Sequence, residues 1–560
     1  MYFQINIFNI LIQKSNFMRY FFILLFVALN GYLSAQSNVE DAIIPLPNVL
    51  EIKPDFYLLS KNMTFRVAEI AWDKNIFLEK KKFIREKFAS GEIELLKQGL
   101  KSLCNINLKY HSKNDRTAAS LELMLDKYMD SAAYTMDISI HGIQISAATN
   151  LGFFYAFQSL MQLVETSTSN RIHCLHISDS PQFSWRGMHL DCSRHFFSVA
   201  EVKRYIDLMS LYKMNVFHWH LTDDQGWRIE IKKYPKLAQI SAWRNGSMVG
   251  EYSDKKFDSI PYGGYYTQNQ IREVVSYAAQ RHITIVPEIE MPGHSLAVLA
   301  AYPEFGCNNS KLEVGKMWGV FDDVFCAGND SVYIFLQNVL DEVIALFPGK
   351  YIHIGGDECP KTFWKVCEKC QNKIKENQLA DEHQLQSYFV QRIEKYVNSK
   401  GKSIIGWDEI LEGGLAPNAA VMSWRGTSGG IAAAQASHFV VMTPGNPCYF
   451  DHYQAKNFTT QPHAIGGYNP LSAVYAFNPI PAELSNENAQ YILGAQGNVW
   501  TEYVLTFSQV EYMAMPRMIA LAENLWTYDS KQNFDDFVSR LKINTSLLDK
   551  RKVNYSKQIE

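Results

Sequence analysis

The chain has no surplus of charge of either sign. Its 560 residues contain 54 Lys and Arg against 57 Asp and Glu, which leaves a formal net charge of −3 with no basic cluster. Proteins that bind nucleic acid carry a basic patch or stripe, so no nucleic-acid partner is expected. Hydrophobic residues make up 47% of the chain and charged residues 20%, which is typical of a folded globular protein.

Long apolar runs are also missing, with one exception near the N-terminus. After Met18-Arg19, residues 20–29 form an apolar run of signal-peptide length, and residues 33–35 supply small side chains before a cleavage point. We therefore expect a signal peptide over residues 1–35, with Met18 as the true start, and a mature chain that is periplasmic or secreted. No other run is long enough to cross a bilayer, and no Cys closely follows this one, so no membrane anchor is expected.

Cysteines are few, and their number, nine, is odd, so they cannot all pair within the chain. Cys307 and Cys326 flank one loop and are candidates for a disulfide in an oxidising compartment. Cys367 and Cys370 have the C-x-x-C spacing of redox and zinc sites, but no second pair with zinc-ribbon spacing accompanies them. We expect a structural role for this second pair.

A Gly-rich dinucleotide-binding loop is absent, which counts against a doubly wound sheet that binds such a cofactor. From about residue 183 onward, short apolar strands alternate with helices. The expected strands are 185–191, 214–220, 283–289, 351–356, 403–407, 421–424, 438–442 and 493–499. The expected helices are 200–213, 268–281, 331–347, 383–400, 428–436 and 509–526. This alternation predicts an α/β fold, a (β/α)8 TIM barrel over residues 181–530.

A smaller α+β domain is expected ahead of the barrel, over residues 36–180, and a helical tail after it, over residues 531–560. The smaller domain should contain an edge strand with prolines, two further strands and a charge-poor helix that is buried against a sheet. These elements are expected at 43–52, 121–125, 134–140 and 151–164.

The segment 351–360, Tyr-Ile-His-Ile-Gly-Gly-Asp-Glu-Cys-Pro, is the most informative in the chain. A short apolar strand leads into two glycines, which allow a close approach of backbone or ligand. Asp357 and Glu358 follow, where a parallel strand ends and chemistry is usually found. Because adjacent carboxylates repel each other, we expect one of them to hold a proton near neutral pH, as a general acid must. An isolated Asp-Glu pair also suits the first turn of a helix.

Polar and aromatic side chains follow all eight expected strands, at the same end of each. In a barrel these ends converge on one mouth, which predicts a single site. Tryptophans offer flat apolar faces to sugar rings, and Asp, Glu and Arg form paired hydrogen bonds with neighbouring hydroxyls. The pattern predicts a sugar-binding pocket, and the residues at these strand ends include Arg194, Asp223, His294, Asp357, Glu358, Trp407, Trp424, Tyr449, Asp451, Trp500 and Glu502.

The spacing of the two carboxylates restricts the mechanism. Most glycosidases place two carboxylates about 5–9.5 Å apart, on opposite sides of the scissile bond, which adjacent residues can hardly do. Either a distant acid is the partner of this pair, or the substrate supplies its own nucleophile. The carbonyl oxygen of an N-acetyl group at C2 can attack C1 and form an oxazolinium ion.

In five segments the chain resembles the β-N-acetylhexosaminidases of glycoside hydrolase family 20, and the resemblance extends over nearly all of the expected mature protein. These segments are 185–195, 218–227, 292–294, 353–358 and 500–502. The resemblance implies an exo-acting, retaining enzyme that removes terminal GlcNAc or GalNAc from glycans through an oxazolinium ion. It implies no cofactor and no metal at the site.

The resemblance also implies a role for each residue of the pocket. Glu358 would be the general acid and then the base, and Asp357 would orient the acetamido group. Asp223 and His294 would form a relay that tunes the proton affinity of Glu358. The remaining residues would bind substrate: Arg194, Glu502 and Asp451 the sugar hydroxyls, Tyr449 the acetamido oxygen, and Trp407, Trp424 and Trp500 the walls of the pocket.

Three alternatives compete with this interpretation. His218-x-His220 after a strand is a good metal-ligand pair, which would suit a metal-dependent TIM-barrel hydrolase. A carbohydrate-binding relative without turnover should have lost the acid, and a family 18-like chitinase should carry spaced acidic residues that this chain lacks. The natural aglycone, the choice between GlcNAc and GalNAc, tolerance of a 6-sulfate, and the state as monomer or homodimer are not decided by the sequence.

Overall fold

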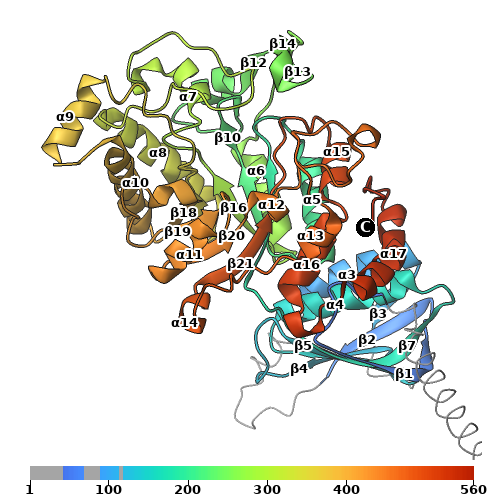
Figure 1. The fold of residues 1–560 in the computed structure, drawn as a ribbon. Coiled ribbons are helices and arrows are strands. Elements are labelled where there is room, and N and C mark those ends of the chain that lie inside the picture. The colour runs from blue at the N-terminus through green and yellow to red at the C-terminus, as the bar shows by residue number, and fades with distance from the viewer. Residues whose placement is uncertain (1–41, 69–88, 112–117, 560) are drawn as a thin grey trace, which may run out of the picture.

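The computed structural model describes residues 42–68, 89–111 and 118–559. The expected signal peptide lies outside these residues. Figure 1 shows two parts: a sheet with helices built from the first part of the chain, and a larger barrel built from the rest. Within the described residues, no helix is long and apolar enough to span a membrane.

The N-terminal part is built on a seven-stranded sheet in the order β1-β7-β5-β6-β4-β2-β3. Its strands are β1 (Val49–Leu58), β2 (Asn62–Val67), β3 (Asn107–Tyr110), β4 (Leu121–Leu125), β5 (Tyr134–Ser139), β6 (Gly142–Ala147) and β7 (Arg171–Asp179). The expected edge strand is β1, but it begins only at Val49. Pro45 and Pro47 precede it, because a proline has no N–H to donate to a sheet.

Two helices cover this sheet, α3 (Ser90–Cys104) and α4 (Asn150–Thr166). The α4 helix is buried on nearly all sides, which explains its charge-poor sequence. Its Tyr155 hydroxyl accepts a hydrogen bond from Arg186 at the start of the barrel's first strand, and its Gln162 amide donates to the Leu211 carbonyl. The helix therefore lies between the sheet and the barrel.

The barrel is closed by eight parallel strands, as the sequence predicts. They are β8 (Trp185–Asp191), β9 (Val216–His220), β16 (Thr284–Glu288), β17 (Tyr351–His353), β18 (Ser403–Trp407), β19 (Ala420–Ser423), β20 (Val440–Met442) and β21 (Ile492–Gly497). Apolar side chains from several of these strands fill its interior, among them Val286, Ile405 and Met422.

Helices surround the barrel: α5 (Val199–Leu211), α6 (Gln268–Ala279), α7 (Leu296–Ala301), α8 (Asp330–Leu346), α9 (Glu368–Glu376), α10 (Glu382–Ser399) and α11 (Ser428–Gln435). The single helix expected over 509–526 is wrong. Two helices occupy this stretch, α15 (Phe507–Ala514) and α16 (Arg517–Trp526). Pro516 separates them, because a proline lacks the N–H of a helix interior and disfavours helical torsions in the residue before it.

The C-terminal helix, α17 (Phe534–Lys550), packs against α4 of the N-terminal part (Figure 1). Asn544 of α17 donates to Gln162, and Arg551, just beyond the helix, pairs with Glu165 at 2.6 Å. The contacts made by Arg186 and Lys213 lie at the amino ends of β8 and β9. The N-terminal part thus contacts the barrel there, at the end opposite the carboxyl ends of the strands.

Candidate active site

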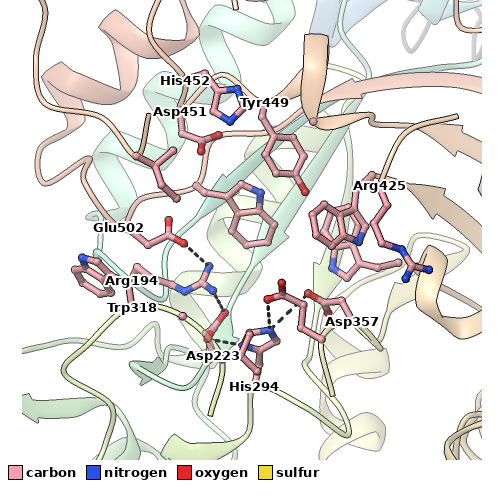
Figure 2. Close-up of a pocket in the computed structure, with 18 of the residues that line it drawn as sticks. Arg194, Asp223, His294, Trp318, Asp357, Arg425, Tyr449, Asp451, His452 and Glu502 are labelled. Atoms are coloured by element: carbon pink, nitrogen blue, oxygen red, sulfur yellow. Dashed lines mark ion pairs between the residues drawn. The ribbon is translucent and has the colours of Figure 1, made fainter. Parts of the chain in front are cut away.

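The carboxyl ends of the barrel strands open into one pocket (Figure 2). Its volume is about 820 Å³, and residues at or just after the carboxyl ends of all eight strands line it. All eleven candidates from the sequence lie in its lining: Arg194, Asp223, His294, Asp357, Glu358, Trp407, Trp424, Tyr449, Asp451, Trp500 and Glu502. Their shared location is a finding of the structure, whereas their individual roles stay predictions.

Gly355 and Gly356, which precede the carboxylate pair, occupy positions where a larger residue would collide with neighbouring side chains. Gly355 and Gly356 have φ angles of 64° and 93°, in the left-handed region. A Cβ on Gly355 would lie 1.7 Å from Oε2 of Glu290, and one on Gly356 would lie 2.5 Å from Ile410. Only glycine fits this turn between β17 and the carboxylates.

His294 contacts both carboxylates of the pair. Its Nε2 lies 3.6 Å from Asp357 Oδ2 and 3.6 Å from Glu358 Oε2. Its Nδ1 lies 3.0 Å from Asp224 and 3.3 Å from Asp223. Although burial opposes a charge on the imidazole, Asp223 and the hydrogen bond to Asp224 raise the pKa of His294 well above its usual value. We infer a cationic imidazolium behind the pair.

Burial and the charge of His294 shift the pKa values of Asp357 and Glu358 in opposite directions. Burial, with the nearby Glu288 and Glu358, raises the pKa of Asp357 to about 6. The hydrogen bond from His294 lowers the pKa of Glu358. As the sequence predicts, one acid of the pair has a raised pKa, but in the substrate-free pocket it is Asp357 and not Glu358, the expected general acid.

Arg194 is held in place by three carboxylates. Its guanidinium lies 2.8 Å from Asp223, 3.3 Å from Asp191 and 3.8 Å from Glu502. Figure 2 shows that ion pairs run without a break from Glu502 through Arg194 and Asp223 to His294 and the carboxylate pair. Arg194 therefore has little freedom to reorient, and its contacts connect one wall of the pocket to the pair.

Aromatic rings form the walls of the pocket. The rings of Trp407 and Trp500 lie 5.9 Å apart at an angle of 46°, and Trp424 stacks on Tyr449 at 6.1 Å. The indoles of Trp407 and Trp424 are held by hydrogen bonds, since Trp407 donates to Glu288 and Trp424 donates to Glu409. Anchored rings leave rigid apolar faces in the pocket.

Tyr449 and Asp451 place oxygen atoms beside these rings in the pocket lining. Burial and the nearby Asp451 raise the pKa of the Tyr449 hydroxyl well above 10, so it keeps its proton and remains a donor. Burial and Glu502 raise the pKa of Asp451 to about 8. Both side chains can therefore donate a hydrogen bond to a polar ligand near neutral pH.

Several lining or supporting residues were not singled out from the sequence. Asp224 makes the shorter of the two carboxylate contacts to His294, and Glu409 anchors Trp424. Trp318 and Arg425 also line the pocket. The position of Asp224 next to Asp223 was a usable signal, but Trp318 lies on the long loop between α7 and α8, away from any strand end.

The histidines of the metal-hydrolase alternative lie beneath the pocket and not in its lining. His218 Nε2 and His220 Nδ1 lie 3.1 Å and 2.5 Å from Glu288, and His220 Nε2 lies 3.0 Å from Asp223. Each imidazole therefore already contacts a buried carboxylate. The arrangement orients these side chains under the carboxylate pair and does not favour the alternative.

The fold and the pocket together define a class. A (β/α)8 barrel whose mouth combines anchored tryptophans, a fixed arginine and an adjacent carboxylate pair has the features of a sugar-cleaving barrel enzyme. A carboxylate pair can perform acid–base chemistry, and aromatic rings and an arginine can bind a sugar.

The chain belongs to glycosyl hydrolase family 20. The sequence profile of the family's catalytic domain matches residues 183–529, and the profile of its domain 2 matches residues 40–180. A beta-hexosaminidase of Porphyromonas gingivalis is 46% identical over 82% of this chain, which spans 60% of that relative's length. The expectation of this family from the sequence is confirmed.

Solved structures agree with this assignment. The GH20 exo-beta-N-acetylglucosaminidase of Vibrio harveyi, solved with N-acetylglucosamine, superposes with a TM-score of 0.80 at 30% identity, covering 93% of this chain and 79% of that chain. The beta-N-acetylhexosaminidase of Bacteroides fragilis superposes with a TM-score of 0.75 at 30% identity, covering 92% and 96%.

Proposed function

We propose that the protein is an exo-acting, retaining β-N-acetylhexosaminidase that uses the acetamido group of its substrate as the nucleophile. One observation carries the proposal: Oδ1 of Asp357, a residue of the pocket lining, is buried and has no hydrogen-bond partner in the described part of the protein. A buried acceptor without a partner is costly. The N–H of a C2 acetamido group would supply the missing donor, next to the tryptophan walls that would enclose its methyl group.

In the proposed reaction, Glu358 gives its proton to the glycosidic oxygen as the bond to C1 breaks. The acetamido oxygen attacks C1, and the charge of Asp357 balances the oxazolinium ion that forms. Water then attacks C1, Glu358 takes its proton, and the configuration at C1 is retained. Tyr449 would donate its hydroxyl to the acetamido oxygen, while Arg194, Asp451 and Glu502 would bind ring hydroxyls.

Substrate binding would reverse the proton preference of the pair. The Glu358 side chain is 41% exposed in the substrate-free pocket, and a bound sugar would remove that water and raise the pKa of Glu358. At the same time the acetamido N–H would favour the ionised form of Asp357. Binding of the correct substrate thus moves the proton to the residue that must donate it.

The decisive experiment compares three nitrophenyl β-glycosides: the N-acetylglucosaminide, the N-acetylgalactosaminide and the plain glucoside. The proposal predicts turnover of one or both acetamido sugars and none of the glucoside, because the glucoside lacks the nucleophile. Turnover of the glucoside at a comparable rate would mean that a protein carboxylate is the nucleophile and that the proposed mechanism is wrong.

We also propose that the mature protein is exported to the periplasm or the medium. The support is the sequence of residues 1–35 alone. N-terminal sequencing of protein recovered from the periplasm or medium of the producing cells should find a start close to residue 36. Recovery of the full-length chain from the cytoplasm would contradict this.

A further inference from the structure

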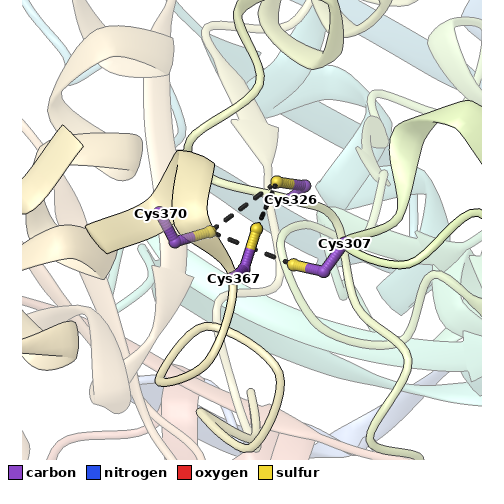
Figure 3. A group of neighbouring side chains, drawn as sticks. All are labelled: Cys307, Cys326, Cys367 and Cys370. Carbon is purple, nitrogen blue, oxygen red and sulfur yellow. Dashed lines mark hydrogen bonds between the residues drawn. The ribbon is translucent and has the colours of Figure 1, made fainter. Parts of the chain in front are cut away.

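Four cysteine side chains from two separate segments meet beside the barrel (Figure 3). Cys307 and Cys326 belong to the loop between α7 and α8, and Cys367 and Cys370 lie at the start of α9. Their four sulfurs all lie within 4.8 Å of one another. Cys307 and Cys326, the candidates for a disulfide, are not bonded to each other, and all nine cysteines are free thiols.

The distances between the sulfurs match a shared metal ion. Cys326 lies 3.6 Å from Cys370 and 3.7 Å from Cys367, and Cys307 lies 3.9 Å from Cys370. Zinc binds thiolates at about 2.3 Å in tetrahedral geometry, which places neighbouring sulfurs roughly 3.8 Å apart. A disulfide requires about 2.05 Å, so any of these pairs would have to move closer by more than about 1.5 Å.

The arrangement of the four sulfurs also fits one shared metal ion better than two separate disulfide bonds. Cys326 and Cys370 each have two sulfur neighbours at nearly equal distance. Gly328 approaches α9 so closely that a Cβ would lie 2.2 Å from the carbonyl carbon of Lys369. The two segments are therefore packed backbone to backbone around the four thiols.

We propose that Cys307, Cys326, Cys367 and Cys370 bind one zinc ion. The protein would supply all four ligands, which is the pattern of structural zinc sites and leaves no position for a substrate. Binding of Zn²⁺ displaces the four thiol protons to solvent. The proposal is independent of the glycosidase activity, and its test needs no substrate.

The position of the site suggests what the metal holds together. The loop between Cys307 and Cys326 carries Trp318, which lines the active-site pocket. The other segment follows directly from Glu358. Hydrogen bonds already join the two, from Trp364 to the Phe325 carbonyl at 2.9 Å and from Thr362 to Asp322 at 2.7 Å. Zinc would fasten one wall of the pocket to the segment that bears the carboxylate pair.

The test is to purify the full chain without chelator, from the compartment in which the cells place it, and to measure its zinc by elemental mass spectrometry. Alkylation of the thiols in denaturant, with and without a chelator, then counts those that the metal protects. We expect one zinc ion per chain and four thiols that become reactive only with the chelator. Replacement by Co²⁺ should produce the absorption bands of a tetrahedral cobalt–thiolate centre.

Variants locate the ion. Cys370→Ser should lose the zinc, whereas Cys104→Ser, a half-buried cysteine outside the cluster, should retain it. If Cys370→Ser does not fold, the metal and thiol counts of the unaltered chain decide the question. Zinc-free protein that contains two disulfides among these cysteines would overturn the proposal. So would free thiols that take up neither Zn²⁺ nor Co²⁺, or the absorption spectrum of bound iron.

Discussion

Two residues at the mouth of the barrel have backbone torsions that few non-glycine residues adopt. Glu358 has a φ of 44° and His294 a φ of 47°, both in the left-handed region. Such torsions cost about 1–2 kcal/mol each, and they persist at functional sites where the surrounding structure enforces them. Here they bring His294 against the carboxylate pair, where its hydrogen bond lowers the pKa of Glu358 and its charge opposes the effect of burial on the pKa of Asp357.

Replacement of the acid tests the role of Glu358. In Glu358→Gln, turnover of a substrate with a poor leaving group, such as a disaccharide, should fall by about 10²–10⁴, because no proton can be donated. A nitrophenyl substrate should lose less, since its leaving group needs less protonation. Steady-state kinetics on both substrates, with circular dichroism as a check of the fold, measures this difference. Equal losses on the two would contradict the assignment.

The pH dependence tests Asp357. Because its pKa is raised to about 6, Asp357 takes up a proton below that pH and loses the charge that would balance the oxazolinium ion. The value of kcat/KM, which reports the free enzyme, should therefore fall as the pH drops below about 6. Asp357→Asn should be slow at every pH, with kcat affected more than KM, and should lack this acid limb. An unchanged limb in Asp357→Asn would assign it to another group.

At the scale of the element, the turn after β17 depends on two glycines. Gly355→Ala would force a Cβ onto Glu290, whereas Gly401→Ala, in the turn after α10, has the same sign of φ and nothing within 4 Å. Both variants should pay about 1–2 kcal/mol for the left-handed torsion. Gly355→Ala should lose a further 1–3 kcal/mol or so from overpacking, and turnover with it.

Denaturant unfolding and kcat of the two glycine variants provide the measurement. The matched variant Gly401→Ala should keep the kcat of the unaltered chain, since Gly401 lies just before the amino end of β18, opposite the end where the pocket opens. If the two variants lose the same free energy of unfolding and Gly355→Ala keeps its kcat, the contact with Glu290 does not shape the turn.

At the scale of the whole molecule, a buried ion pair joins the N-terminal part to the barrel. Asp179, at the end of β7, pairs with Lys213 at 3.0 Å, and both side chains are fully buried. Asp179 also accepts hydrogen bonds from Tyr134 of the same sheet and from Trp526 of α16. One carboxylate therefore connects the sheet to two elements of the barrel.

Asp179→Asn should reduce the free energy of unfolding by about 3–5 kcal/mol, because it leaves the Lys213 charge buried without a partner. The matched control is Asp137→Asn, which removes an exposed pair with His176 on the same sheet and should cost at most about 1 kcal/mol. Denaturant unfolding with far-ultraviolet circular dichroism measures both. A loss in Asp179→Asn no larger than in the control would show that the pair does not hold the two parts together.

Much of this architecture follows from local sequence pattern. Apolar stretches that alternate with helices specify the eight barrel strands within a few residues, because the period of the side chains is a local property of the chain. The same pattern places polar residues at the strand ends, and parallel strands bring those ends to one mouth. The apolar periodicity over residues 509–526 continues through Pro516, so it does not reveal that this proline divides the stretch into two helices.

What the sequence by itself determined is therefore the barrel, the family and eleven residues of the pocket lining, but not Trp318 or Arg425. The tertiary structure alone decided where the proton prefers to sit, because the affinities of Asp357 and Glu358 depend on burial and on His294 and Asp224, which are distant in the chain. It also decided that four cysteines meet. Cys307 and Cys326 are separated from Cys367 and Cys370 by helix α8 and strand β17, and only folding brings the two pairs together.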